Sequence, residues 1–244
     1  MRTNNAFGMT TVGEILRKTL AMYKRRFVLF LSLAAVIYVP YYLFLSAVQL
    51  EGSVLAMAGA IVPGVVAQAL ASAMVVWVIV RTTLGHEAGF VNALGSLTPP
   101  LVMRLLGTTL LVTGAVTEGF FLFVVPGLVL LVLFSLVNQV VVVEGIAYIE
   151  AVRRSTELIR DSWWRVLSVL LVLVLINLTA LVVCHFLFGE AAAVPGQLFG
   201  ILFAPFWSIA LTLLYFDLRT EKEGFAIESL GDLMSNEEDL YIPR

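Results

Sequence analysis

The chain has 244 residues, of which 60% are hydrophobic and 13% are charged. Soluble proteins average about 45–50% apolar and about 25% charged residues, so a soluble fold with this composition would expose large apolar patches. The net charge of −2 gives no general attraction to nucleic acid, and the single Cys184 excludes an internal disulfide or a cysteine-rich metal site.

Residues 1–26 are expected to form a loose tail followed by an amphipathic helix. Thr11 and Glu14 have the spacing of a capping box, which favours a helix start. Apolar residues then recur at helical spacing opposite basic ones, as in helices that lie among lipid headgroups. A helix packed on the cytoplasmic end of a membrane bundle has the same pattern, so both placements stay open. The basic residues are Arg17, Lys18, Lys24, Arg25 and Arg26.

Six apolar runs follow, each close to the roughly 20 residues that cross the hydrocarbon as a helix. The runs are continuous and rich in Leu and Ala, which excludes a barrel of alternating strands. They predict an all-α integral membrane protein with a six-helix bundle over residues 27–218, joined in pairs by turns at 51–53, 118–119 and 189–195. The predicted spans are 27–49, 55–80, 101–117, 120–143, 166–188 and 196–218. Residues 219–244 are more polar and predict an acidic cytoplasmic tail.

The tripeptide Val-Pro-Gly occurs three times, each time early in the second span of a pair. The residue types of 14–19 also return at 150–155 with the same spacing, and a weaker copy lies at 92–104. We therefore predict three pseudo-repeated hairpins, each preceded by a short amphipathic segment at the cytoplasmic interface. Small residues in the second span place it inside the bundle. A structural role is expected for Pro63, Gly64, Pro126, Gly127, Pro195 and Gly196.

Lysine and arginine gather on one side of the predicted membrane. All 15 lie in the N-terminal segment, the two long connections or the C-terminal tail. The positive-inside rule then predicts both termini in the cytoplasm. The second long connection supplies further candidate contacts to anionic headgroups, although ordinary anchoring would use the same residues. These are Arg153, Arg154, Arg160 and Arg165, and Glu150 is expected to pair with Arg154 at i,i+4.

Few polar side chains interrupt the spans. Asn138, Gln139 and Asn177 form a candidate intramembrane polar site, which can bond neighbouring helices or line a ligand path. His86 and His185 are expected on opposite sides of the membrane, and the standard catalytic and nucleotide-binding motifs are missing. The sequence therefore predicts no catalytic residue, no cofactor and no metal site, and the protein is expected not to be an enzyme.

Several motifs resemble a bacterial family. They are Val125-Pro126-Gly127, Val143-Glu144-Gly145, the segment 150–155 and the run Tyr215-x-Asp217-x-Arg219 near the C-terminus. These motifs are similar to the membrane domain that precedes some glycerophosphoryl diester phosphodiesterase catalytic domains. The resemblance covers about residues 10–230 and implies a stand-alone six-span member of the inner membrane. It does not imply phosphodiesterase activity, because that activity belongs to a separate barrel domain of about 250 residues.

The leading hypothesis is a non-enzymatic inner-membrane protein associated with lipids or the envelope. It would bind anionic lipid or act as a scaffold for a protein partner at the cytoplasmic face, with no nucleic-acid partner. The alternative is a transporter, or the membrane subunit of one, with a site at Asn138, Gln139 and Asn177. Asp217 and Arg219 are expected to tie the end of the sixth span to the basic segments.

Overall fold

The structure is a computed structural model, and it describes residues 11–51 and 59–224. The fold is all-α: 89% of it is helical, and the described residues contain no strand. The predicted N-terminal tail, most of the first predicted turn and most of the predicted acidic tail lie outside the described residues.

Six helical spans in the described part of the chain are long and apolar enough to cross a membrane, so the protein is a multi-pass membrane protein. The spans are α2 (Phe27–Glu51), α4 (Ile61–Thr83), α6 (Pro99–Leu122), α7 with α8 (Val124–Leu133 and Val137–Glu144), α10 (Trp163–Phe188) and α11 (Ala193–Glu223). The shorter elements are α1 (Val12–Arg25), α5 (Phe90–Gly95), α9 (Tyr148–Ile159) and the 3-10 helix η1 (Gly189–Ala192).

The predicted turn between the third and fourth spans is misplaced. Helix α6 continues through Glu118 and Gly119 to Leu122, and the chain turns at the extended residue Phe123 (φ −162°, ψ 156°). Glu118 is exposed on the helix surface, so its charge does not require a turn there. The sixth helix also continues past its predicted end, to Glu223, and this extension carries charged residues of the candidate site.

Each Val-Pro-Gly segment begins the returning helix of a hairpin. Pro63, Pro126 and Pro195 are the third residues of α4, α7 and α11. Proline is tolerated in a first helical turn, because the N–H that it lacks would have no partner inside the helix. The three prolines therefore start helices without breaking them, as their predicted structural role requires. The threefold repeat of the whole sequence stays a prediction.

Two of the glycines that follow these prolines allow aromatic rings to approach the backbone. A Cβ on Gly64 would lie 2.6 Å from Tyr41 Oη, and a Cβ on Gly127 would lie 2.4 Å from Phe120 Cγ. In both hairpins the ring comes from the outgoing helix, so the absence of a side chain lets the two helices pack closely. A Cβ on Gly196 would meet only an ordinary contact, at 3.5 Å.

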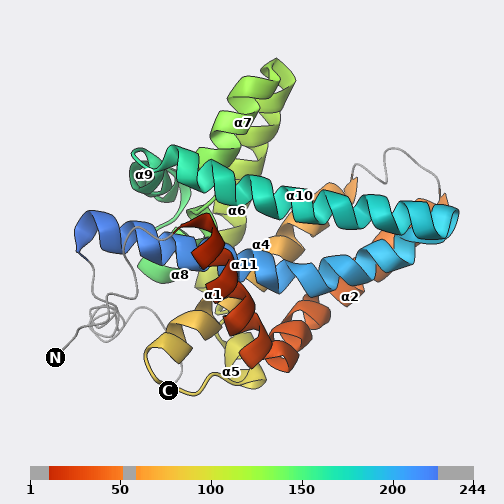
Figure 1. Cartoon of the computed structure of the whole chain (residues 1–244), viewed down its shortest axis with the longest axis horizontal. Coiled ribbons are helices and arrows are strands. Elements are labelled where there is room, and N and C mark those ends of the chain that lie inside the picture. Colours follow the sequence, from red (N-terminus) through yellow and green to blue (C-terminus); the bar gives the residue numbers. More distant parts are fainter. Residues whose placement is uncertain (1–10, 52–58, 225–244) are drawn as a thin grey trace.

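The three hairpins meet near one end, and the middle hairpin then diverges from the other two (Figure 1), which stay in contact where Gln197 of α11 donates to Ser46 of α2 at 3.2 Å. Helices α10 and α11 run side by side in one direction, whereas the α6–α7 hairpin projects in another. The helices converge near α8, α9 and the C-terminal end of α11, a region that we call the charged end (residues 144–165 and 215–223).

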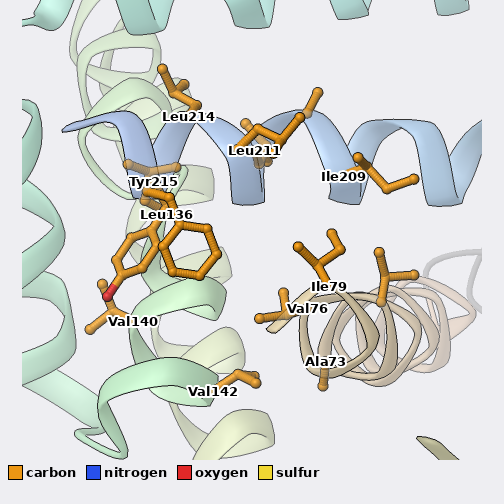
Figure 2. Packing of buried hydrophobic residues seen from close by; sticks show 14 of the residues in the cluster. Ala73, Val76, Ile79, Leu136, Val140, Val142, Ile209, Leu211, Leu214 and Tyr215 are labelled. Carbon is orange, nitrogen blue, oxygen red and sulfur yellow. The ribbon is translucent and has the colours of Figure 1, made fainter. Parts of the chain in front are cut away.

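Helices α4 and α11 form the centre of the fold, and each buries about half of its residues, as predicted for the interior placement of the second span. Figure 2 shows the packing between them and α8. Ile79 of α4 faces Ile209 of α11, and Val140 of α8 lies beside Tyr215 of α11, as does Leu136, the residue just before α8. By contrast, α10 exposes many of its apolar side chains along its length, as expected of a lipid-facing helix.

Helix α1 is packed on the bundle through its apolar side. Thr11 caps its start, because the Thr11 side chain accepts the backbone N–H of Glu14, as the capping box predicted. Ile15, Thr19 and Tyr23 are buried where α1 packs on α11, and Tyr23 Oη donates to the Leu202 carbonyl at 2.8 Å. The packed placement left open by the sequence is therefore found, and the opposite, basic side of α1 stays exposed or half-exposed.

Helix α9 is fixed to α6 at its start. Ala147 has no side chain that could cap the helix, and Tyr148 takes a left-handed backbone conformation with φ 58°. The Tyr148 N–H donates instead to Thr108 Oγ1 of α6 at 2.7 Å. Its ring covers Gly107, where a Cβ would lie 2.6 Å from a ring carbon. The second basic segment is thus held against the third span.

Candidate functional site

A closed ring of polar and charged side chains, which we call the charge ring, joins α8, α9 and α11. Glu144 accepts hydrogen bonds from Arg154 Nε at 2.8 Å and from Tyr215 Oη at 2.7 Å. Arg219 donates to Tyr215 Oη at 3.0 Å and to Glu223 at 3.1 Å. Arg154 Nη2 closes the ring by donating to Glu223. Two arginines and two glutamates balance each other, so the charge ring carries no net formal charge.

Local structure explains how these side chains meet. Tyr215, Arg219 and Glu223 follow one another at intervals of four residues and share one face of α11. Glu144 ends α8, where the left-handed Gly145 turns the chain towards α9. Burial alone would lower the pKa of Arg154, but its hydrogen bonds to Glu144 and Glu223 outweigh burial and raise that pKa. The guanidinium therefore stays charged, and the ring holds three helices together.

The predicted pairing of Glu150 with Arg154 is wrong. Arg154 turns towards the half-buried Glu144 and Glu223, while Glu150 is exposed. An exposed i,i+4 pair contributes only about 0.2–0.5 kcal/mol, so better-shielded carboxylates on other helices compete successfully.

Asp217 behaves as predicted: its Oδ2 lies 3.5 Å from Arg165 Nη1, which ties α11 to the second basic segment. Arg219 instead ties α11 to α8, through Tyr215 and Glu144.

In the second connection, most of the basic residues predicted to bind lipid headgroups already form ion pairs with carboxylates. Arg153 pairs with Glu157 on the surface at 3.0 Å, and Arg165 pairs with both Asp217 and Glu221. Arg154 belongs to the charge ring. Arg160 has no ion-pair partner among the described residues, and it lines a surface cavity of about 430 Å³ with Trp163 and Arg153. This connection therefore offers little unpaired positive charge to a lipid.

The cations of α1 have different surroundings. A cavity of about 570 Å³, which we call the basic cavity, lies between α1, α2, α4 and α11. Arg26 donates to the Ala88 carbonyl at 3.2 Å, and within the described ranges no carboxylate lies at ion-pair distance from Arg25 or Arg26. Arg17 and Lys24 are exposed on the same helix outside the cavity. The basic cavity is lined by Lys18, Ala21, Met22, Arg25, Arg26, Phe30, Ile79, Thr82 and Leu213.

The predicted intramembrane site is divided between two places. Thr109 Oγ1 of α6 donates to Asn138 Oδ1 of α8 at 3.0 Å, so Asn138 joins two helices. Gln139 is buried beside it in α8. Asn177 of α10 instead lines a separate cavity of about 360 Å³, which we call the carboxamide cavity. That cavity is lined by Gln68, Val174, Asn177, Leu178 and Trp207.

Sequence reasoning missed the charge ring as a unit. The resemblance motifs contain Glu144, Tyr215 and Arg219, but nothing in them pointed to their contact. The available signal was the four-residue spacing that places Tyr215, Arg219 and Glu223 on one face of α11. The basic cavity was also missed, because it depends on how α1 lies across α11.

Among residues 11–51 and 59–224, no group of three or more His, Cys, Asp or Glu side chains is placed to hold a metal ion. In comparisons with protein-family models, with curated proteins and with solved structures, nothing matches this chain. The resemblance to phosphodiesterase membrane domains stays a prediction.

Proposed function

We propose that this membrane protein binds an anionic lipid headgroup in the basic cavity. The observation that carries the proposal is the lining, in which Lys18, Arg25 and Arg26 face an apolar wall formed partly by Phe30 and Leu213. A lipid phosphate needs cationic donors, and its acyl chains need an apolar surface. The cavity supplies both at one place, and its volume of about 570 Å³ lies within the usual range of ligand sites.

Arginine suits this role because its guanidinium can donate two parallel hydrogen bonds to a phosphate. Each Lys or Arg near an anionic membrane surface contributes about 1 kcal/mol of attraction. Arg25 has no carboxylate partner within the described residues, and Arg26 is held by a backbone carbonyl that leaves its charge uncompensated. The ion pairs of Arg153, Arg154 and Arg165 make them weaker candidates.

A binding role fits the lining better than catalysis does. The described lining of the basic cavity contains cations, apolar groups and Thr82, but no carboxylate, histidine or cysteine that could act as a base or nucleophile. The placement in a bacterial inner membrane, with the basic side of α1 and both termini in the cytoplasm, is part of the proposal. It rests on the positive-inside distribution of lysine and arginine.

The test measures lipid selectivity of the full-length protein in mixed vesicles of phosphatidylglycerol and phosphatidylcholine. Lipids that copurify after extraction with mild detergent are quantified by mass spectrometry. The wild-type protein should retain phosphatidylglycerol above its bulk fraction. An Arg25→Gln/Arg26→Gln variant should lose this preference by roughly 30-fold in affinity, from about 1 kcal/mol for each cation.

A matched control removes the same charge from the same helix outside the cavity. Arg17→Gln/Lys24→Gln should keep most of the preference, since both side chains lie outside the basic cavity. If bound lipids mirror the bulk mixture, or if both double variants lose selectivity equally, the proposal is wrong.

The transport alternative keeps one supporting observation: Asn177 lines a cavity within the membrane-spanning helices. A transport path predicts that this position meets water from both sides in turn. In a Cys184→Ser background, Asn177→Cys should then react with a membrane-impermeant maleimide from either side of sealed vesicles. No reaction from either side would speak against transport through this cavity.

A further inference from the structure

The carboxamide cavity lies at the depth of the hydrocarbon. Asn177 is about 16 Å along α10 from the helix end at Phe188, at about 1.5 Å per residue. The other polar lining groups are Gln68 of α4 and Trp207 of α11. Three spans thus bring two carboxamides and an indole to one intramembrane cavity.

The carboxamides have unused hydrogen-bonding capacity. Tyr38 Oη donates to Gln68 Oε1 at 2.7 Å, which fixes the amide and leaves its two N–H donors. In the described part of the chain, no side chain or backbone group hydrogen-bonds to Gln68 Nε2 or to the Asn177 carboxamide. An unsatisfied polar group in hydrocarbon costs several kcal/mol. A molecule that enters the cavity and accepts these hydrogen bonds is therefore favoured.

The lining also indicates where such a molecule comes from. Val174 and Leu178 form part of the cavity wall and expose 37% and 51% of their surface on α10. This side of α10 is apolar and faces lipid, so the cavity is reached laterally from the bilayer. Because the lining contains no charged side chain, a charged ligand would lose its hydration without compensation.

We propose that the carboxamide cavity binds an uncharged lipid through its ester carbonyl, with Gln68 and Asn177 as hydrogen-bond donors. The carbonyl accepts from the amides, and the acyl chains lie against Val174 and Leu178. A diacylglycerol-type lipid has this chemistry, because it combines ester carbonyls with apolar chains and no charge. The proposal is independent of the basic cavity, which would hold an anionic headgroup between other helices.

The test uses photolabelling of the full-length protein in dodecyl maltoside, a detergent whose tail has no carbonyl. One probe is a diacylglycerol with a diazirine in an acyl chain, and the other is a diazirine alkane of the same chain length. Mass spectrometry of the peptides locates the label. The diacylglycerol probe should label residues 174–178 and Trp207 at least about threefold more than the alkane does, the size expected for one intramembrane hydrogen bond.

Near-isosteric variants test the carboxamides themselves. Asn177→Leu and Gln68→Met should each reduce diacylglycerol labelling by about threefold, towards the alkane level. Thr179→Val, which changes an exposed residue outside the cavity, should label like the wild type. Arg25→Gln/Arg26→Gln should also leave this labelling unchanged, which separates the two proposals. Equal labelling by both probes, or wild-type labelling in both carboxamide variants, would overturn the inference.

Discussion

The charge ring makes a quantitative prediction at Glu144. The substitution Glu144→Gln keeps the size of the side chain but replaces its carboxylate with a neutral amide, so the hydrogen bond from Tyr215 becomes neutral and the one from Arg154 loses its anionic acceptor. A hydrogen bond to a charged group contributes about 1.5–3 kcal/mol and a neutral one about 0.5–1.5 kcal/mol. The loss is therefore about 1–1.5 kcal/mol at Tyr215. Arg154 still donates as a cation, but it loses the attraction of a shielded carboxylate, which we take as a similar amount, so the total is about 2–3 kcal/mol. The side chain of Glu144 is only 14% exposed, so solvent screens little of this effect.

The assay is thermal unfolding of the purified protein in detergent, followed by tryptophan fluorescence. In a chain of this size, about 1 kcal/mol shifts Tm by roughly 2–4 °C, so Glu144→Gln should lower Tm by roughly 4–12 °C. The matched control is Glu157→Gln, which breaks the exposed pair with Arg153 and should shift Tm by less than about 2 °C. Equal shifts in the two variants would refute the view that the ring stabilises the charged end.

Three further predictions concern stability, and each depends on a single contact. Gly127→Ala should destabilise the fold by about 1–3 kcal/mol, because the new Cβ would lie 2.4 Å from Phe120 Cγ. Ser155→Ala should cost about 1–2 kcal/mol, since Ser155 Oγ donates at 2.7 Å to the last carbonyl of α7 and that half-buried acceptor would lose its partner. The hydrogen bond from Lys222 lowers the pKa of Asp161, so the stability from this contact is present above the unfolded-state pKa of the carboxyl and is lost as pH falls through the lowered value. Melting curves of these variants, and of Asp161→Asn between about pH 7 and pH 3, measure all three effects.

Each of these changes has a control in the same fold. A Cβ on Gly114 meets no atom within 4 Å, so Gly114→Ala should be tolerated. Ser168 donates to a carbonyl on the exposed side of α10, so Ser168→Ala should change Tm little. The difference in Tm between wild type and Asp161→Asn should vanish at the acid end of the titration. A difference that is constant across the whole range would contradict the assigned pairing of Asp161.

The number of spans was predictable because apolar length alone decides whether a helix can cross the bilayer. Span boundaries were less predictable, since Glu118 resembled a turn residue but lies on the surface of a continuous helix. The break between α7 and α8 had no sequence signal: residues 134–136 contain neither Gly nor Pro. At this break the last carbonyl of α7 accepts a hydrogen bond from Ser155 of α9. Sequence patterns that predict helix ends from neighbouring residues cannot detect such a tertiary contact.

The candidate sites show the same division between local and tertiary information. The basic character of α1 could be read from the sequence, as could the presence of polar side chains such as Asn177. The sequence could not show which of the basic residues stay unpaired. Arg154 and Arg25 differ only in the carboxylates that other helices bring near them. Likewise, Asn138 and Asn177 looked equivalent until packing gave one a partner in Thr109 and the other a cavity.

The bend of the middle hairpin has a practical consequence for mapping this protein. Residues 121–125 are all apolar and exposed, and Phe121 exposes 87% of its surface. Water is a poor solvent for such a cluster, so we expect the bend between α6 and α7 to rest below the phosphates of its leaflet. Proteases, antibodies and impermeant reagents would then fail to reach it. A topology map drawn with them would find no accessible loop between these two spans, and would count two crossings fewer than the six helices that are long and apolar enough to cross.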